Sequence, residues 1–130
     1  MRQDETRQDT LAGSDWSRRP LSFLLWWGLP YAVAVAFDLI GPPLRAGAAV
    51  WALALAWMGV GCVLNARRCH RVHCYISGPA LLVAATSAGL LAAGVLDLGP
   101  KGLSIVTWAA FVAVLLSFAP EILWRRYAGS

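Results

Sequence analysis

The chain has 130 residues, of which 58% are hydrophobic and 14% are charged. Soluble domains carry about 45–50% apolar and about 25% charged residues, so this composition argues against a water-soluble globule. A formal net charge of +4 on so apolar a chain is too small for a nucleic-acid-binding protein. The length suffices for one compact unit without a second domain.

The first 19 residues are polar, mixed in charge and without helical periodicity. Such a segment cannot bury enough apolar surface to offset the entropy of folding. We therefore expect residues 1–19 to be a disordered cytoplasmic tail, followed by one transmembrane domain over residues 20–127.

Four apolar segments follow the tail, each about 18–21 residues long. They are Leu21–Ile40, Gly47–Leu64, Ile76–Leu96 and Leu103–Leu123. At a rise of 1.5 Å per residue, a helix of this length matches a hydrocarbon core of about 30 Å. Helices also satisfy their own backbone groups in lipid. The predicted fold is all-α: a polytopic membrane protein whose four transmembrane helices form two helical hairpins.

Segments one and three end in a similar phrase, Asp38-Leu39-Ile40-Gly41-Pro42 and Asp97-Leu98-Gly99-Pro100. Glycine and proline end a helix, and the negative end of the helix dipole disfavours a carboxylate there. We expect Arg45 and Lys101 to compensate by pairing with Asp38 and Asp97. The two carboxylates would lie at the outer face, either as solvated anchors or as an attractor of cations.

Small residues recur at four-residue spacing in segments two and three. The two stripes are Ala48, Ala52 and Ala56, and Ala85, Gly89 and Ala93. Stripes of this kind let membrane helices approach closely. They predict that these helices form the inner pair of the bundle, or that one of them is the face of a homo-oligomer.

All three cysteines and both histidines of the chain lie within residues 62–74. Cys69, His70, His73 and Cys74 are the candidate metal ligands, and Cys62 is a candidate relay position inside the membrane. On one continuous helix the four loop residues would span an arc of about 140°, too narrow to surround a tetrahedral ion. Two or three of them suffice for a soft ion such as Hg(II), Cu(I) or Zn(II).

Polar residues between these ligands are expected to support them. Arg68 and Arg71 flank Cys69, and positive charge favours the thiolate form that binds metals. Asn65 precedes them. Ser77-Gly78-Pro79 closes the segment and predicts the start of the third helix, because serine or glycine caps helices and proline is favoured in the first turn.

Cations are distributed unevenly along the chain. Nine of the eleven lie in the two tails and the central connection: Arg2, Arg7, Arg18, Arg19, Arg67, Arg68, Arg71, Arg125 and Arg126. Because cytoplasmic loops are enriched in Lys and Arg, this asymmetry predicts cytoplasmic termini in a bacterial inner membrane.

The phrase Asn65-Ala66-Arg67-Arg68-Cys69-His70-Arg71-Val72-His73-Cys74 resembles the central loop of a group of small, uncharacterised four-span bacterial membrane proteins. The size, span number and use of cysteine are also similar to those of the mercury-resistance membrane transporters. That second resemblance implies movement of a soft metal ion along cysteines. The chain lacks the cysteine pair that those transporters have in their first span.

These observations favour a membrane protein that binds and transports a soft metal ion. One alternative is an accessory subunit whose basic loop binds anionic lipid or a protein partner. Another is a membrane thiol oxidoreductase. Since no acid–base pair, nucleophile triad or dinucleotide fingerprint occurs, we expect a non-enzyme without a cofactor beyond such an ion.

Overall fold

The computed structural model describes residues 2–124. Arg125 and Arg126, which contribute to the predicted charge asymmetry, lie outside the described residues. Every regular element within residues 2–124 is helical, and four helical segments are long and apolar enough to cross a membrane. The predicted all-α fold with four spans is therefore confirmed.

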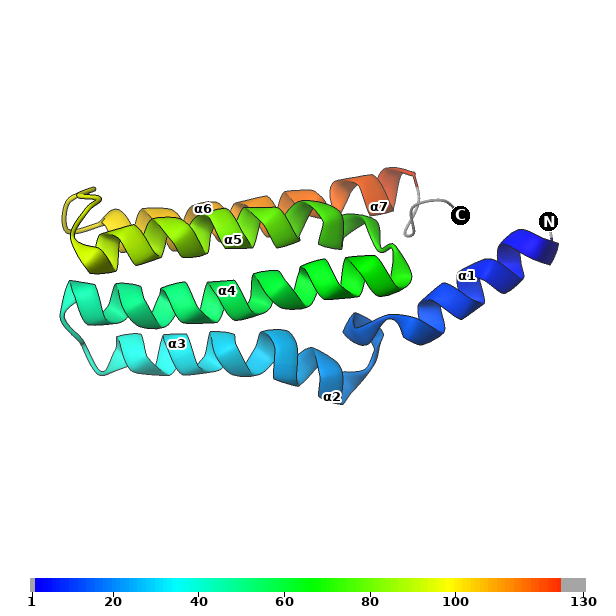
Figure 1. Cartoon of the computed structure of the whole chain (residues 1–130), viewed down its shortest axis with the longest axis horizontal. Coiled ribbons are helices and arrows are strands. Elements are labelled where there is room, and N and C mark those ends of the chain that lie inside the picture. Colours follow the sequence, from blue (N-terminus) through cyan, green and yellow to red (C-terminus); the bar gives the residue numbers. More distant parts are fainter. Residues whose placement is uncertain (1, 125–130) are drawn as a thin grey trace.

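The first span, Pro20–Leu39, consists of three consecutive helical pieces (Figure 1). They are α2 (Pro20–Phe23), the π-helical turn η2 (Leu24–Gly28) and α3 (Leu29–Leu39). In the π turn the N–H of Leu29 bonds the carbonyl of Leu24, five residues back. Pro30 follows directly and has no N–H to donate, which explains why the regular α-helical ladder is interrupted here.

The bounds of the other three spans differ from those of the apolar segments that predicted them. They are α4 (Leu44–Cys69), α5 (Val72–Ala93) and α6 (Gly102–Ser117), and the short helix α7 (Ala119–Leu123) completes the last span. Only His70 and Arg71 separate α4 from α5. Ser77-Gly78-Pro79 lies inside α5, so the prediction that these residues start the helix is wrong.

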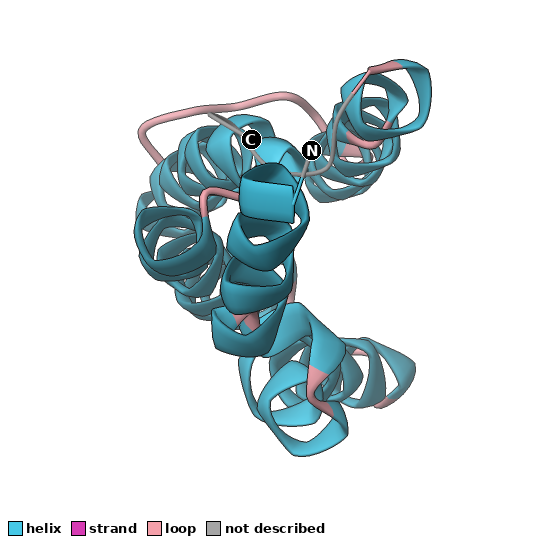
Figure 2. Ribbon diagram, turned by 90° about the vertical axis from the view of Figure 1, so that its right-hand side faces the viewer, coloured by secondary structure: helices cyan, strands magenta, loops and turns pink. Residues whose placement is uncertain are grey.

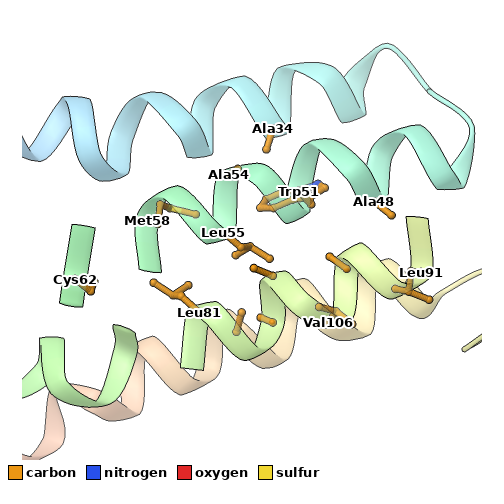
Figure 3. Packing of buried hydrophobic residues seen from close by; sticks show 14 of the residues in the cluster. Ala34, Ala48, Trp51, Ala54, Leu55, Met58, Cys62, Leu81, Leu91 and Val106 are labelled. Carbon is orange, nitrogen blue, oxygen red and sulfur yellow. The ribbon is translucent and has the colours of Figure 1, made fainter. Parts of the chain in front are cut away.

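α4 and α5 form the inner pair, as predicted, and the first and last spans flank them (Figure 1). The 18-residue apolar window is 50% buried in α4 and 39% buried in α5, against 6% and 22% in the first and last spans. Leu55 and Met58 of α4 face Leu81 of α5 in the core (Figure 3). Seen along the bundle, the helices do not close into a ring (Figure 2).

The close approach of α4 and α5 depends on glycines other than the predicted Gly89. A Cβ atom on Gly59 would lie 3.2 Å from the carbonyl oxygen of Gly78, and a Cβ atom on Gly78 would lie 2.9 Å from the side chain of Val63. A Cβ atom on Gly89 would have no neighbour within 4 Å among the described residues. Gly89 of the predicted stripe therefore makes no contact with α4, whereas Ala85 of the same stripe is buried in the core.

The tail expected to be disordered is helical in this structure. Helix α1 (Arg2–Ser14) has no buried residue, and the segment after Ser14 packs onto the bundle through the 3-10 turn η1 (Trp16–Arg18). Asp15 caps that turn by accepting a hydrogen bond from the backbone N–H of Ser17. A local cap and tertiary contacts at Asp15 and Trp16 thus order a segment whose composition is that of a flexible tail.

Candidate functional site

The turn between α4 and α5 places the predicted ligands on two helices instead of one. α4 ends at Cys69, where His70 adopts a left-handed conformation with φ of 55° and its N–H bonds the carbonyl of Ala66. α5 begins two residues later at Val72. We call this end of the bundle the basic end, because five arginines lie there: Arg18, Arg19, Arg67, Arg68 and Arg71.

Cys62 of α4 and Cys74 of α5 form the thiol pair of the site. Both side chains are buried, and they lie on facing helices: a Cβ atom on Gly78, one turn after Cys74 in α5, would lie 3.4 Å from Cys62 Cβ. Cys62 Sγ accepts hydrogen bonds from Trp27 Nε1 at 3.1 Å and from Ser77 Oγ at 3.5 Å. Asn65 Nδ2 donates to Cys74 Sγ at 3.5 Å.

His73 connects the thiol pair to a carboxylate. Its Nδ1 lies 2.7 Å from Glu121 Oε1, its Nε2 lies 3.4 Å from Cys74 Sγ, and its ring stacks on Phe118 at 4.3 Å between centroids. An ionised carboxylate only accepts hydrogen bonds, so Nδ1 carries the proton and Nε2 of the neutral ring is an acceptor. The arrangement holds the imidazole with its lone pair toward Cys74.

The two remaining predicted ligands have other hydrogen-bond partners. Cys69 is buried, and its Sγ donates to the carbonyl of Asn65 in its own helix at 3.1 Å. His70 is exposed, and its Nδ1 lies 2.7 Å from the hydroxyl of Tyr75. Within residues 2–124, no group of three or more His, Cys, Asp or Glu side chains is arranged to hold a metal ion. The pair of Cys69 and Cys74 as primary ligands stays a prediction.

The side chain of Arg71 binds buried carboxylates, although the sequence predicted that it would support a thiol. Its Nη1 donates to Asp15 Oδ2 at 2.6 Å and to Ser17 Oγ at 2.7 Å. Its Nε pairs with Glu121 Oε1 at 3.3 Å. Asn65 joins the same group, because its Nδ2 donates to Asp15 Oδ1 at 2.8 Å. We call Asp15, Asn65, Arg71 and Glu121 the Arg71 network.

Charge and hydrogen bonding outweigh burial within this network. Burial alone raises the pKa of Asp15, but hydrogen bonds from Ser17, Asn65 and Arg71 bring that pKa below its ordinary value. Burial likewise lowers the pKa of Arg71, and the two carboxylates more than offset it, so that the pKa is raised. Both groups are therefore charged at neutral pH. The other predicted supporting residue, Arg68, stacks over Trp16 at 4.7 Å.

Sequence reasoning missed Asp15 and Glu121. Glu121 had a detectable signal, since it is an ionisable residue inside the last apolar segment, where such residues are costly and tend to be functional. Asp15 had none, because it belongs to a tail whose composition resembles that of a disordered segment. The contacts of both residues are to parts of the chain about 50 positions away.

The carboxylates at the opposite end of the bundle do not form the predicted ion pairs. Asp38 Oδ2 accepts a hydrogen bond of 2.6 Å from Trp51 Nε1, and Asp97 Oδ1 accepts one of 2.9 Å from the N–H of Gly99. All ion pairs among residues 2–124 lie at the basic end. An indole and a backbone amide thus take the place of Arg45 and Lys101.

A cleft of about 620 Å³ runs between the first and last spans. Its walls are aromatic and aliphatic side chains of the two flanking spans, and α4 and α5 form its floor. Cys62, His73 and Ser77 line it near the basic end. Cys62 therefore borders a cavity as well as the protein core. No protein-family model, curated protein or solved structure matches the chain.

Proposed function

We propose that this membrane protein binds a soft metal ion through the thiolates of Cys62 and Cys74. The observation that supports the proposal is the placement of these two buried cysteines on facing helices, beside the close contact of Gly78 with α4, where each sulfur accepts a hydrogen bond. The ligand set differs from that expected from sequence, since Cys62 replaces Cys69 in the pair.

Two sulfur ligands select the kind of ion. Thiolate is a soft ligand that favours Cu(I) and related ions. Structural zinc sites use four ligands, whereas Cu(I) and Hg(II) are stable between two thiolates. The proposed ligand is therefore an ion that is stable with only two thiolate ligands. Binding would release the two thiol protons, and the Nε2 acceptor of His73 beside Cys74 is placed to receive one of them.

Transport across a bacterial inner membrane is the further part of the proposal. Cys62 lies within a span, and both it and His73 border the cleft. An ion held there is closer to the middle of the membrane than one held at Cys69, where α4 ends. Soft-ion movement by ligand exchange between thiols is also what the resemblance to mercury-resistance transporters implies.

Metal titration of the purified protein in detergent tests the binding step. Cu(I) would be titrated against a chromophoric Cu(I) chelator, with the thiols kept reduced by a phosphine. We expect Cys62→Ser and Cys74→Ser each to weaken Cu(I) affinity by more than about 100-fold, since even partners outside the ligand shell contribute 10- to 100-fold. Cys69→Ser is the matched control and is expected to retain the affinity, because the Cys69 thiol bonds its own helix.

Equal Cu(I) affinity in all three variants would refute the proposal. So would a loss confined to Cys69→Ser, which would restore the ligand set predicted from sequence. The accessory-subunit alternative makes a different prediction: cysteine variants are silent, and Gly89→Leu abolishes association with a partner. Because a Cβ at Gly89 would have no neighbour within 4 Å among residues 2–124, that substitution tests association without disturbing the packing of the bundle.

A further inference from the structure

The cleft between the first and last spans has an apolar length and one polar end. Aromatic side chains line it from both flanking spans, including Trp27 and Tyr31 on one side and Trp108 and Phe111 on the other. The polar side chains Ser17, Cys62, His73 and Ser77 border it near the basic end. This division favours an amphipathic ligand whose polar head faces Cys62.

Two hydrogen-bond donors at the polar end are weakly engaged. Trp27 Nε1 and Ser77 Oγ both donate to the sulfur of Cys62, at 3.1 Å and 3.5 Å. A thioether or thiol sulfur is a weak acceptor. A carbonyl oxygen brought to this end of the cleft would be a better partner for either donor, at no cost of an unsatisfied group elsewhere.

The cleft is accessible from the side of the bundle. Trp108 is 66% exposed and Tyr31 is 51% exposed, although both lie within spans. Since the spans would be surrounded by lipid, a molecule dissolved in the hydrocarbon region reaches these side chains without crossing water. At the polar end, Trp27 beside Cys62 and Phe118 beside His73 favour stacking against a planar ring.

We infer that the cleft binds a lipid-soluble molecule with a planar ring bearing carbonyl oxygens, of the isoprenoid quinone class, with its ring toward Cys62 and its chain along the aromatic walls. The volume of about 620 Å³ lies within the range of about 300–1,000 Å³ found for small-molecule sites.

Quenching of tryptophan fluorescence by decylubiquinone tests this inference in metal-free protein in nanodiscs, so its result is independent of metal binding. Val114→Trp fills the cleft, because Val114 lines it. Val112→Trp is the matched control: it adds the same chromophore to the same helix, but Val112 is 48% exposed and does not line the cleft. We expect saturable quenching in the wild type and in Val112→Trp, and at least tenfold weaker binding in Val114→Trp.

A second pair of variants, on the opposite wall of the cleft, tests the inference independently if Val114→Trp fails to fold. Val35 of α3 lines the cleft, whereas Val33 is 54% exposed and does not. Val35→Trp should weaken quinone binding, and Val33→Trp should not. Linear, non-saturable quenching in every protein would overturn the inference. So would a wild-type dimer that Val114→Trp converts to a monomer without any saturable quenching, which would assign the cleft to a second copy of the chain.

Discussion

Arg71 shows how a single side chain can join segments that are distant in sequence. Its guanidinium pairs with Asp15 from the tail and with Glu121 from the last span, while its side chain is only 15% exposed. The three groups compensate one another, since a buried charge is tolerated when it is paired and hydrogen-bonded. Loss of the central cation would leave two buried carboxylates facing each other.

We predict that Arg71→Met destabilises the protein strongly. Removing one partner from a buried ion pair costs about 3–5 kcal/mol because the remaining charge is uncompensated. The free energy of unfolding would be measured by titrating the protein from mild detergent into SDS. Arg67→Met is the control, because Arg67 is an exposed arginine in the last turn of α4. A loss below about 1 kcal/mol, typical of surface ion pairs, would contradict the role of Arg71.

At the scale of single residues, the sequence predicts which side chains are candidate ligands but not which of them lie close together in the fold. The concentration of Cys and His in residues 62–74 indicated a site, and three of its members, Cys62, His73 and Cys74, do converge. Their partnership depends on the rotation of α4 relative to α5, which a two-residue turn at His70 sets. No local pattern encodes that rotation, so the sequence alone gives no means of choosing between Cys62 and Cys69 as the partner of Cys74.

At the scale of helices, apolar length predicted the spans well and their ends poorly. α4 continues past its apolar segment to Cys69 because Arg67 and Arg68 lie in its last turn, where the helix dipole favours cations. Pro79 is tolerated inside α5, as prolines are in transmembrane helices whose neighbours satisfy the freed backbone groups. Short-range rules for caps and breakers, derived from helices in water, therefore misplaced the start of α5.

Gly78 is predicted to be essential for the packing of α5 on α4, unlike Gly89. A Cβ at Gly78 would lie 2.9 Å from Val63 Cγ2 and 3.3 Å from the backbone nitrogen of Val63, so Gly78→Ala must move the helices apart. Overpacking of this kind costs about 1–3 kcal/mol. Thermal unfolding in detergent should show a lower midpoint for Gly78→Ala and an unchanged or higher one for Gly89→Ala. Equal midpoints would contradict the assignment of the helix contact.

At the scale of the molecule, the order of the helices determines where the site can be. The inner pair supplies both thiols, and the flanking spans leave the cleft beside them instead of closing over it. Hydropathy could not predict this opening, because all four spans have similar mean hydropathy, from 1.5 to 2.1. Which faces remain unpaired is decided by side-chain fit and by the Arg71 network at one end.

The arrangement of the whole chain also gives a test of its orientation. The tail helix, the α4–α5 turn and α7 lie at one end of the bundle, and the α3–α4 and α5–α6 connections lie at the other (Figure 1). The positive-inside rule predicts that the basic end is cytoplasmic.

In a variant with all three native cysteines changed to serine, a new cysteine at Leu98, in the exposed α5–α6 connection, should react with a membrane-impermeant maleimide added to intact cells. A cysteine at Thr10 in α1 should react only after the cells are lysed. The reverse pattern would invert the orientation and place the thiol pair near the outer face, where an ion would be captured on entry to the membrane and not released from it.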